Sequence, residues 1–372
     1  MPDVWPFVPR LMAREVLSFL TDIRKTPTGE VRDSLRAARH IIDMEFGLDD
    51  AQNALAESMF RAGAAGDWLM PVWPELTQFP VPASVGTSVF RVNDPSEYVV
   101  GEFAFLVLGD QQFQQVEVAA LGVDSVTITA PSLIAASSIA PLRLAYITGD
   151  LGGARWFKGL AVRKLEVEFR TGNDIAATPY DQYLGADLVT DPSVIASPLE
   201  AKLTLARVFI DNGFGPVVVE PMRDIIDAMT QIVHKDFGHA AMARRKRWFR
   251  HLRGRDRSFW LPTWTHDLSL SAAVTSGQAY VDIKPLYGSP ADLVGRHIII
   301  DDGQGFLPRM IEAGVSSGGA WRLTIAAPGR AVEPTARVMF LNRMRLDTDQ
   351  IEMALTGIHY METNVTAVEV NE

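Results

Sequence analysis

The segment Gly314-Val315-Ser316-Ser317-Gly318 fits the G-x-S-x-G pattern, in which a strained turn exposes a nucleophilic serine. Asp347 and His359 follow it in the order in which hydrolases carry their other catalytic residues. A nucleophile elbow needs a strand, a tight turn and then a helix. The residues that follow, Trp321-Arg322-Leu323-Thr324-Ile325, instead have the character of a strand. We therefore predict a hairpin turn at this position, no catalytic residue in the chain, and no enzymatic activity.

Metal and cofactor sites have equally weak support in the sequence. The seven histidines include no pair at helical spacing with a catalytic glutamate, and no tight His/Asp/Glu cluster. The chain has no cysteine, which excludes disulfides, thiolate catalysis and cysteine-ligated metals. No glycine-rich loop that could cradle a phosphate follows a strand. We expect neither a metal nor a cofactor.

Residues 244–257 are the strongest charge feature, with eight basic side chains and one acid, a net charge of +7. The whole chain carries −10, so the remainder carries −17. Trp248 and Phe249 lie within this run, and aromatic and arginine side chains together are typical of interfaces. Three interpretations remain open: a solvated basic face, a docking surface for an acidic region of a neighbouring subunit or partner, and a contact with nucleic acid passing nearby. The candidate subunit or partner interface consists of Arg244, Arg245, Arg247, Trp248, Arg250 and Arg253.

An internal repeat indicates how these residues are positioned. Residues 32–73 align without a gap to residues 223–264 at an offset of 191, with nine identities in 42 positions. The identities include residues whose backbone or packing roles are hard to replace. Those that define the repeat are Gly47 and Gly238, Pro71 and Pro262, and Trp73 and Trp264. Two halves with one plan are more typical of a building block than of a catalyst.

The elements expected around the repeat are mostly short strands. A strand within 35–46 leads to a helix over about 50–62, and the second half has its counterpart helix over about 240–253. Each helix is followed by a Trp- and Pro-containing segment and then by short strands at close spacing. The sequence therefore predicts a mainly β protein with a few short helices (α+β), built as two related β-sandwich or barrel-like modules from an internal duplication. We place the first module at 1–172, a connecting segment at 173–203, and the second, homologous module at 204–372.

The bulk properties narrow the function classes. No stretch reaches the ~18–20 apolar residues needed to cross a bilayer, and the N-terminus has no signal-peptide pattern, so we expect no membrane insertion. A net charge of −10 argues against a general nucleic-acid binder.

Several motifs spread along the chain resemble those of one protein family. They are Trp5-Pro6, Leu17-Ser18-Phe19-Leu20-Thr21-Asp22, Gly29-Glu30-Val31-Arg32, Pro71-Val72-Trp73-Pro74-Glu75-Leu76-Thr77, Asp211-Asn212-Gly213-Phe214-Gly215 and Trp260-Leu261-Pro262-Thr263-Trp264-Thr265-His266-Asp267-Leu268. With them the chain resembles the tail-tip (distal tail or baseplate) structural proteins of long, flexible-tailed bacteriophages and related prophages. None of these motifs is catalytic.

This resemblance implies a structural virion protein that forms a ring at the tail tip and is assembled in the host cytoplasm. The implied partners are further copies of the chain, as a homo-hexamer or homo-trimer, together with the tail tube protein, the baseplate hub and the tail fibre proteins. Contact with DNA in the tail lumen is a further partner interaction, which the sequence favours less than these protein partners. The alternative is a β-sandwich module of the tail tip that binds carbohydrate or another host-surface polymer.

Overall fold

The computed structural model describes residues 3–25, 29–63, 66–109, 112–157, 159–170, 177–194, 201–211, 213–356 and 359–370. Within them the protein is mainly β with two α-helices, which confirms the general fold class expected from the sequence. The helices are α1 (Asp50–Gly63) and α2 (His239–Leu252), and the 3-10 helices are η1 (Trp73–Glu75), η2 (Pro95–Glu97) and η3 (Pro290–Leu293). The strands are β1 (Leu11–Lys25), β2 (Glu30–Leu48), β3 (Trp68–Pro71), β4 (Thr77–Ala83), β5 (Val89–Arg91), β6 (Phe103–Gly109), β7 (Gln112–Leu121), β8 (Ser125–Ile128), β9 (Ala136–Ile147), β10 (Gly152–Phe157), β11 (Leu160–Phe169), β12 (Gln182–Tyr183), β13 (Ala186–Leu188), β14 (Ala201–Ile210), β15 (Val218–Phe237), β16 (Ser258–Pro262), β17 (Tyr280–Ile283), β18 (His297–Asp301), β19 (Phe306–Met310), β20 (Ala313–Ser317), β21 (Ala320–Thr324), β22 (Arg337–Leu346), β23 (Gln350–Leu355) and β24 (Tyr360–Glu369).

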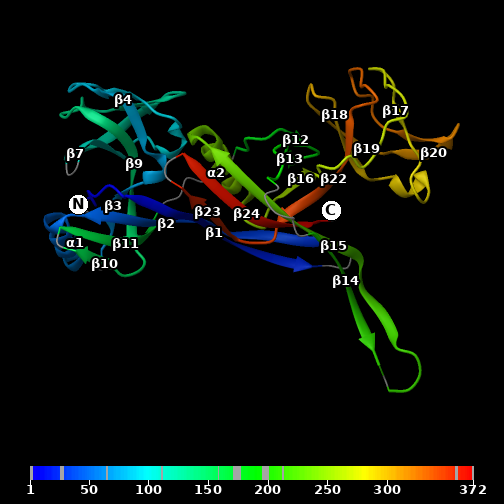
Figure 1. Ribbon diagram of the computed structural model, residues 1–372, viewed down its shortest axis with the longest axis horizontal. Helices are drawn as coiled ribbons and strands as arrows, with labels where there is room; N and C mark the ends of the chain where they lie inside the picture. Colours follow the sequence, from blue (N-terminus) through cyan, green and yellow to red (C-terminus); the bar gives the residue numbers. More distant parts are fainter. Residues whose placement is uncertain are drawn as a thin grey trace.

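The centre of the molecule is an antiparallel sheet of eight strands in the order β10–β11–β2–β1–β23–β24–β15–β14. Figure 1 shows it running across the molecule, with the β14–β15 hairpin projecting as an arm at one end. The pairing of β1 with β23 joins strands from the two halves of the sequence. The two halves of the chain therefore share one sheet, to which each contributes four strands.

The central sheet has one covered face, because its strands alternate apolar and polar residues. Along β2, the side chains from His40 to Leu48 alternate between buried and more accessible positions, with Ile42, Met44 and Phe46 in the core. The largest hydrophobic cluster lies on this face and includes residues of α2, β3 and β16. The opposite face of β2 presents Asp43 and Glu45 to the outside.

Two smaller β units flank the central sheet, at the upper left and upper right of Figure 1. In the first, β9 pairs with β3 and β6, β6 with β7, and β8 with β5 and β7. In the second, β22 pairs with β16 and β18, β18 with β19, and β21 with β17 and β20. Each unit has its own buried cluster, around Phe90 and Val126 in the first and around Ile298 and Trp321 in the second.

Both helices lie within one or two residues of the ranges expected from the sequence. Gly238, at the N-cap of α2, has φ +80°, a backbone conformation that favours glycine. Its repeat partner Gly47 lies within β2 and shows no positive φ. Gly63, the last residue of α1, has no room for a side chain, because a Cβ there would collide with the ring of Trp68.

The expected connecting segment, 173–203, contributes more than a connection. Residues 173–176 and 195–200 lie outside the described part of the chain. In the described part, β12 pairs with β13, and β13 pairs in parallel with β16. Tyr180 is buried in the main cluster. This segment is therefore integral to the fold of the second half.

Candidate functional site

Ser316 does not have the geometry of a catalytic nucleophile. It lies in β20 and pairs with Trp321 of β21, and the turn between the two strands is formed by Gly318 and Gly319. The expected hairpin is present, although its turn begins later than the Gly314–Gly318 segment suggested. Because a strand follows this turn instead of a helix, no nucleophile elbow is formed.

Neither a metal site nor a membrane-spanning helix is found in the described part of the chain. No group of three or more His, Asp or Glu side chains there could hold a metal ion. None of the described helices is both long and apolar enough to cross a membrane.

The basic helix α2 lies inside the molecule. Nine of its fourteen residues are buried, and several of them carry charge. Lys246 places its Nζ 2.7 Å from Glu15 Oε2 of β1 and 2.7 Å from Glu75 Oε1 of η1. The acids that neutralise it therefore come from the first half of the chain.

These three groups shift one another's pKa. Burial opposes the charged form of Lys246, but the carboxylates of Glu15 and Glu75 outweigh it and raise the pKa of Lys246. Burial likewise opposes ionisation of Glu15, but Lys246 and a hydrogen bond with His40 lower its pKa below the usual value. Burial raises the pKa of Glu75. Glu15 is therefore the more firmly ionised of the two partners of Lys246.

A second buried group adjoins this one. Arg250 of α2 pairs with Glu97 of η2, and Arg143 of β9 donates to the other carboxylate oxygen of Glu97 at 2.8 Å. Burial opposes ionisation of Glu97, but Arg250 and Arg143 outweigh it and lower its pKa to about 2. We refer to Glu15, His40, Glu75, Glu97, Arg143, Lys246 and Arg250 together as the ionic joint.

Arg245 is held by the second half itself. It donates to Tyr180 Oη at 2.7 Å and contacts Asp236 Oδ2 and Asp191 Oδ2 at 3.2 and 3.1 Å. Trp248 is fully buried and packs edge-on against Phe259, with ring centroids 5.2 Å apart.

These positions correct part of the interface expected from the sequence. Arg245, Trp248 and Arg250 are at most 4% exposed, so a neighbouring subunit could not reach their side chains. Arg244 and Arg247 keep 40% and 39% of their side chains exposed, and Arg253 is half-buried. For these three the interface remains a prediction. Sequence reasoning missed Glu15, Glu75 and Glu97, to which only the charge imbalance of +7 against −17 pointed.

The residues that define the repeat do not all have equivalent surroundings. Pro71 and Pro262 occupy the same place, each pairing with a leucine, Leu142 of β9 and Leu341 of β22. Trp73 is 1% exposed, whereas Trp264 is half-buried and has a positive φ of 60°. η1 is covered by α2, but Thr265 and His266 beside Trp264 are exposed.

The uncovered face of the central sheet is polar and lined with ion pairs. Arg14 of β1 lies 2.8 Å from Asp43 of β2, 3.7 Å from Glu166 of β11 and 3.3 Å from Glu352 of β23. Further pairs on this face are Lys164–Glu45, Arg39–Glu168 and Lys235–Glu362. Acids outnumber basic groups among these paired residues, six to four.

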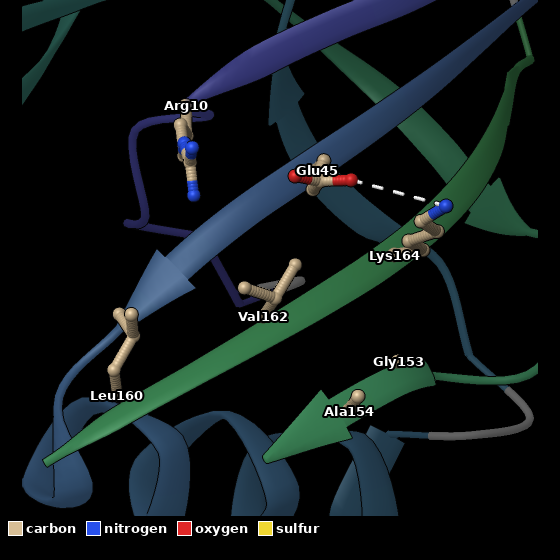
Figure 2. Close-up of a pocket in the computed structure, with 7 residues that line it drawn as sticks. All are labelled: Arg10, Glu45, Gly153, Ala154, Leu160, Val162 and Lys164. Atoms are coloured by element: carbon tan, nitrogen blue, oxygen red, sulfur yellow. Dashed lines mark ion pairs between the residues drawn. The ribbon is translucent and has the colours of Figure 1, made fainter. Parts of the chain in front are cut away.

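A cavity of about 600 Å³ opens on the same face near its β10 end. Figure 2 shows Gly153 and Ala154 of β10, Leu160 and Val162 of β11, and the Lys164–Glu45 ion pair around it. Its wall next to β10 is formed by small or apolar residues and by backbone. This arrangement suits an apolar side chain better than a charged ligand.

No protein-family model matches the sequence, and no curated protein matches it. The functional argument therefore rests on the chain itself: its sequence motifs, a sheet shared by its two halves with one polar face, and a buried ionic joint between the halves.

The buried titratable groups predict loss of stability in acid. Burial, with a smaller contribution from Arg245, lowers the pKa of His234 to about 3 from its usual 6.5. Between these values the unfolded chain binds a proton that the folded chain does not, so stability falls as the pH falls through this window. We expect His234 alone to contribute up to about 1.4 kcal/mol per pH unit. Below about pH 4.5, protonation of Glu97 in the unfolded chain adds to the loss.

Urea unfolding at a series of pH values between 7 and 4.5 measures this slope. A His234→Asn variant should show a shallower dependence than the wild type in that range. Equal slopes for the two proteins would contradict the assignment to His234.

Proposed function

We propose that this chain is a structural virion protein that forms a ring at the distal end of a phage tail, linking the tail tube to the hub or baseplate and the fibres. The proposal rests first on the motifs that resemble tail-tip proteins. The structural observation that carries it is the eight-stranded sheet, which has one covered face, one polar face and two end strands. A sheet of this kind is suited to line a channel once copies of it are joined side by side.

An internal duplication is part of this proposal. The 191-residue offset is one line of support, and the order of the strand pairings is another. The pairings β1–β2, β2–β11 and β10–β11 have counterparts in β14–β15, β15–β24 and β23–β24. Even the parallel bridge of Val4 to β3 has a counterpart in the parallel pairing of β13 with β16. Two related modules per chain would make a ring of copies pseudo-symmetric, with twice as many modules as chains.

The alternative of a carbohydrate-binding module gains little support from the tryptophans. Sugars stack on exposed aromatic rings, whereas six of the eight tryptophans, Trp5, Trp68, Trp73, Trp248, Trp260 and Trp321, are at most 6% exposed. Trp264 is half-buried. We therefore propose assembly as the primary role.

The proposed function predicts both an assembly and a location. Purified protein should form closed rings, whose copy number is obtained from mass measurement and averaged electron-microscope projections. In particles made from the phage or prophage that encodes the chain, gold-labelled antibody should mark the tail end. Deleting the gene should abolish tailed particles, and normal particle numbers after deletion would contradict the proposal.

A further inference from the structure

The central sheet ends in two strands that have no partner on their outer side within the described part of the chain. There, β10 pairs only with β11, and β14 pairs only with β15. An open edge presents unpaired N–H and C=O groups that can accept a further strand. Both edges are visible at opposite ends of the sheet in Figure 1.

Inside the chain, the two halves are already joined by pairing the edge strand of one half with the edge strand of the other. At this joint, residues Arg14–Ser18 of β1 pair with Gln350–Ala354 of β23, across the boundary between the two halves. Above the same joint, α2 of the second half covers η1 of the first half through the Lys246–Glu75 contact. The first half thus supplies a strand edge and a 3-10 helix, and the second half supplies a strand edge and a covering helix.

The counterparts of α2 and η1 at the repeat offset, α1 and the segment Trp264–His266, are not covered in this way within the chain. α1 buries only Asn53 and Ala56, against nine buried residues in α2. Leu55 of α1 corresponds to Lys246 at the repeat offset of 191, and it is 42% exposed. His266, which corresponds to Glu75, is exposed next to the half-buried Trp264. The buried ion pair between Lys246 and Glu75 therefore has no ionic counterpart: Leu55 and His266 occupy the equivalent positions.

The two free edges also have matching surfaces. The β14–β15 arm exposes apolar side chains, among them Leu203 at 75%, Phe209 at 58% and Val218 at 48%. At the other edge, Gly153 and Ala154 of β10 border the cavity of about 600 Å³ shown in Figure 2, which also has apolar walls from Leu160 and Val162 of β11. An isolated chain would leave this apolar arm in water, which is unfavourable unless a partner covers it.

We propose that copies of this chain join head to tail through a second joint built like the internal one. In it, β14 of one copy continues the sheet by pairing with β10 of the next, and α1 of that next copy packs against the segment Trp264–His266 of the first. This inference rests on the proposed function and specifies which surfaces of two neighbouring copies meet in the ring. The partner is a second copy, because the surfaces that meet are counterparts of surfaces that already meet inside the chain.

Such a contact is heterologous, so repeated copies form a ring when the rotation closes. Each copy supplies eight strands, and three copies would close a barrel of about 24 strands, whereas six would need about 48.

Site-specific photo-crosslinking tests the joint directly. We would replace Leu55 with p-benzoylphenylalanine, irradiate the assembled protein and map the link by mass spectrometry. We expect a link between chains to the segment 258–296, which contains Trp264. The same group at Arg61, which lies on another face of α1, should not link to that segment. Links from position 55 only to other segments would overturn the proposal.

A substitution pair gives a second, independent readout. Leu55→Glu places a charge in the proposed joint and should raise the concentration for half-assembly by about 100-fold or more. Arg61→Glu should change it by less than about threefold. Because both side chains are exposed in the single chain, both variants should keep the wild-type unfolding midpoint. Normal assembly of Leu55→Glu into rings at the tail tip would overturn this joint and leave the proposed function standing, whereas the absence of any ring or tail location overturns the proposed function.

Discussion

Replacing Lys246 with methionine is expected to lower the free energy of unfolding by about 3–5 kcal/mol. Lys246 is 2% exposed and is the shared partner of Glu15 and Glu75, which are also buried. Methionine fills a similar volume, so the main effect is two buried carboxylates left without their counter-charge. Burial already raises the pKa of Glu75, and this carboxyl should become protonated first in the variant.

Urea unfolding at pH 7 measures the effect, with Arg244→Met as the matched control on the same helix. Arg244 keeps 40% of its side chain exposed, and its pair with Asp191 should contribute less than about 1 kcal/mol. Adding Glu75→Gln to Lys246→Met should recover part of the loss, because it removes one uncompensated carboxylate. A loss for Lys246→Met no larger than for Arg244→Met would show that the ionic joint does not hold the two halves together.

The ionic joint also explains why the two helices of the repeat differ so strongly in charge. α2 crosses to the first half and meets Glu15, Glu75 and Glu97 there, so its basic residues satisfy acids within the chain. α1 is nearly neutral, and it contacts a basic residue instead, Arg163 of β11, through Asn53 and Glu57. Buried charge pairs of this kind add little net stability over apolar packing, but they penalise any other placement of the helix.

Local patterns in the sequence were sufficient for much of the fold. The two helices follow from the periodicity of their apolar residues, and short strands such as β5, β8, β17 and β18 follow each Trp- and Pro-containing segment as expected. β2 was only partly recognised, because the expected strand at 35–46 is the inner part of Glu30–Leu48. Its outer part alternates between half-buried and exposed residues and lacks a strong apolar signal.

The positions of the site residues were harder to predict, because they depend on contacts distant in sequence. The local sequence around Arg245 predicts an exposed basic surface, because most runs of charged residues are solvated. The partners that bury it at Lys246 and Arg250 lie more than 150 residues earlier, at Glu75 and Glu97. The pairing of β1 with β23 likewise joins residues more than 300 positions apart, beyond the reach of any local pattern.

The two tryptophans that define the repeat should respond to substitution in different ways. Trp73→Ala should lower the free energy of unfolding by about 3–5 kcal/mol, because it leaves a cavity in the main core. Trp73 is 1% exposed, and its ring meets Phe105 edge-on at 5.9 Å. Trp264→Ala should cost the single chain much less, because Trp264 is only half-buried, with Phe306 at 6.1 Å.

Assembly should reverse this order. If α1 of a neighbouring copy covers Trp264–His266, Trp264→Ala removes an anchor at the centre of that contact and should weaken assembly by about 10-fold or more at unchanged fold. Unfolding midpoints and half-assembly concentrations of the two variants, measured side by side, separate these effects. Equal stability losses with no change in assembly would mean that both rings serve only to pack their own halves. If only Trp73→Ala loses stability and only Trp264→Ala loses assembly, Trp73 serves to stabilise the fold and its repeat counterpart Trp264 serves to hold neighbouring copies together.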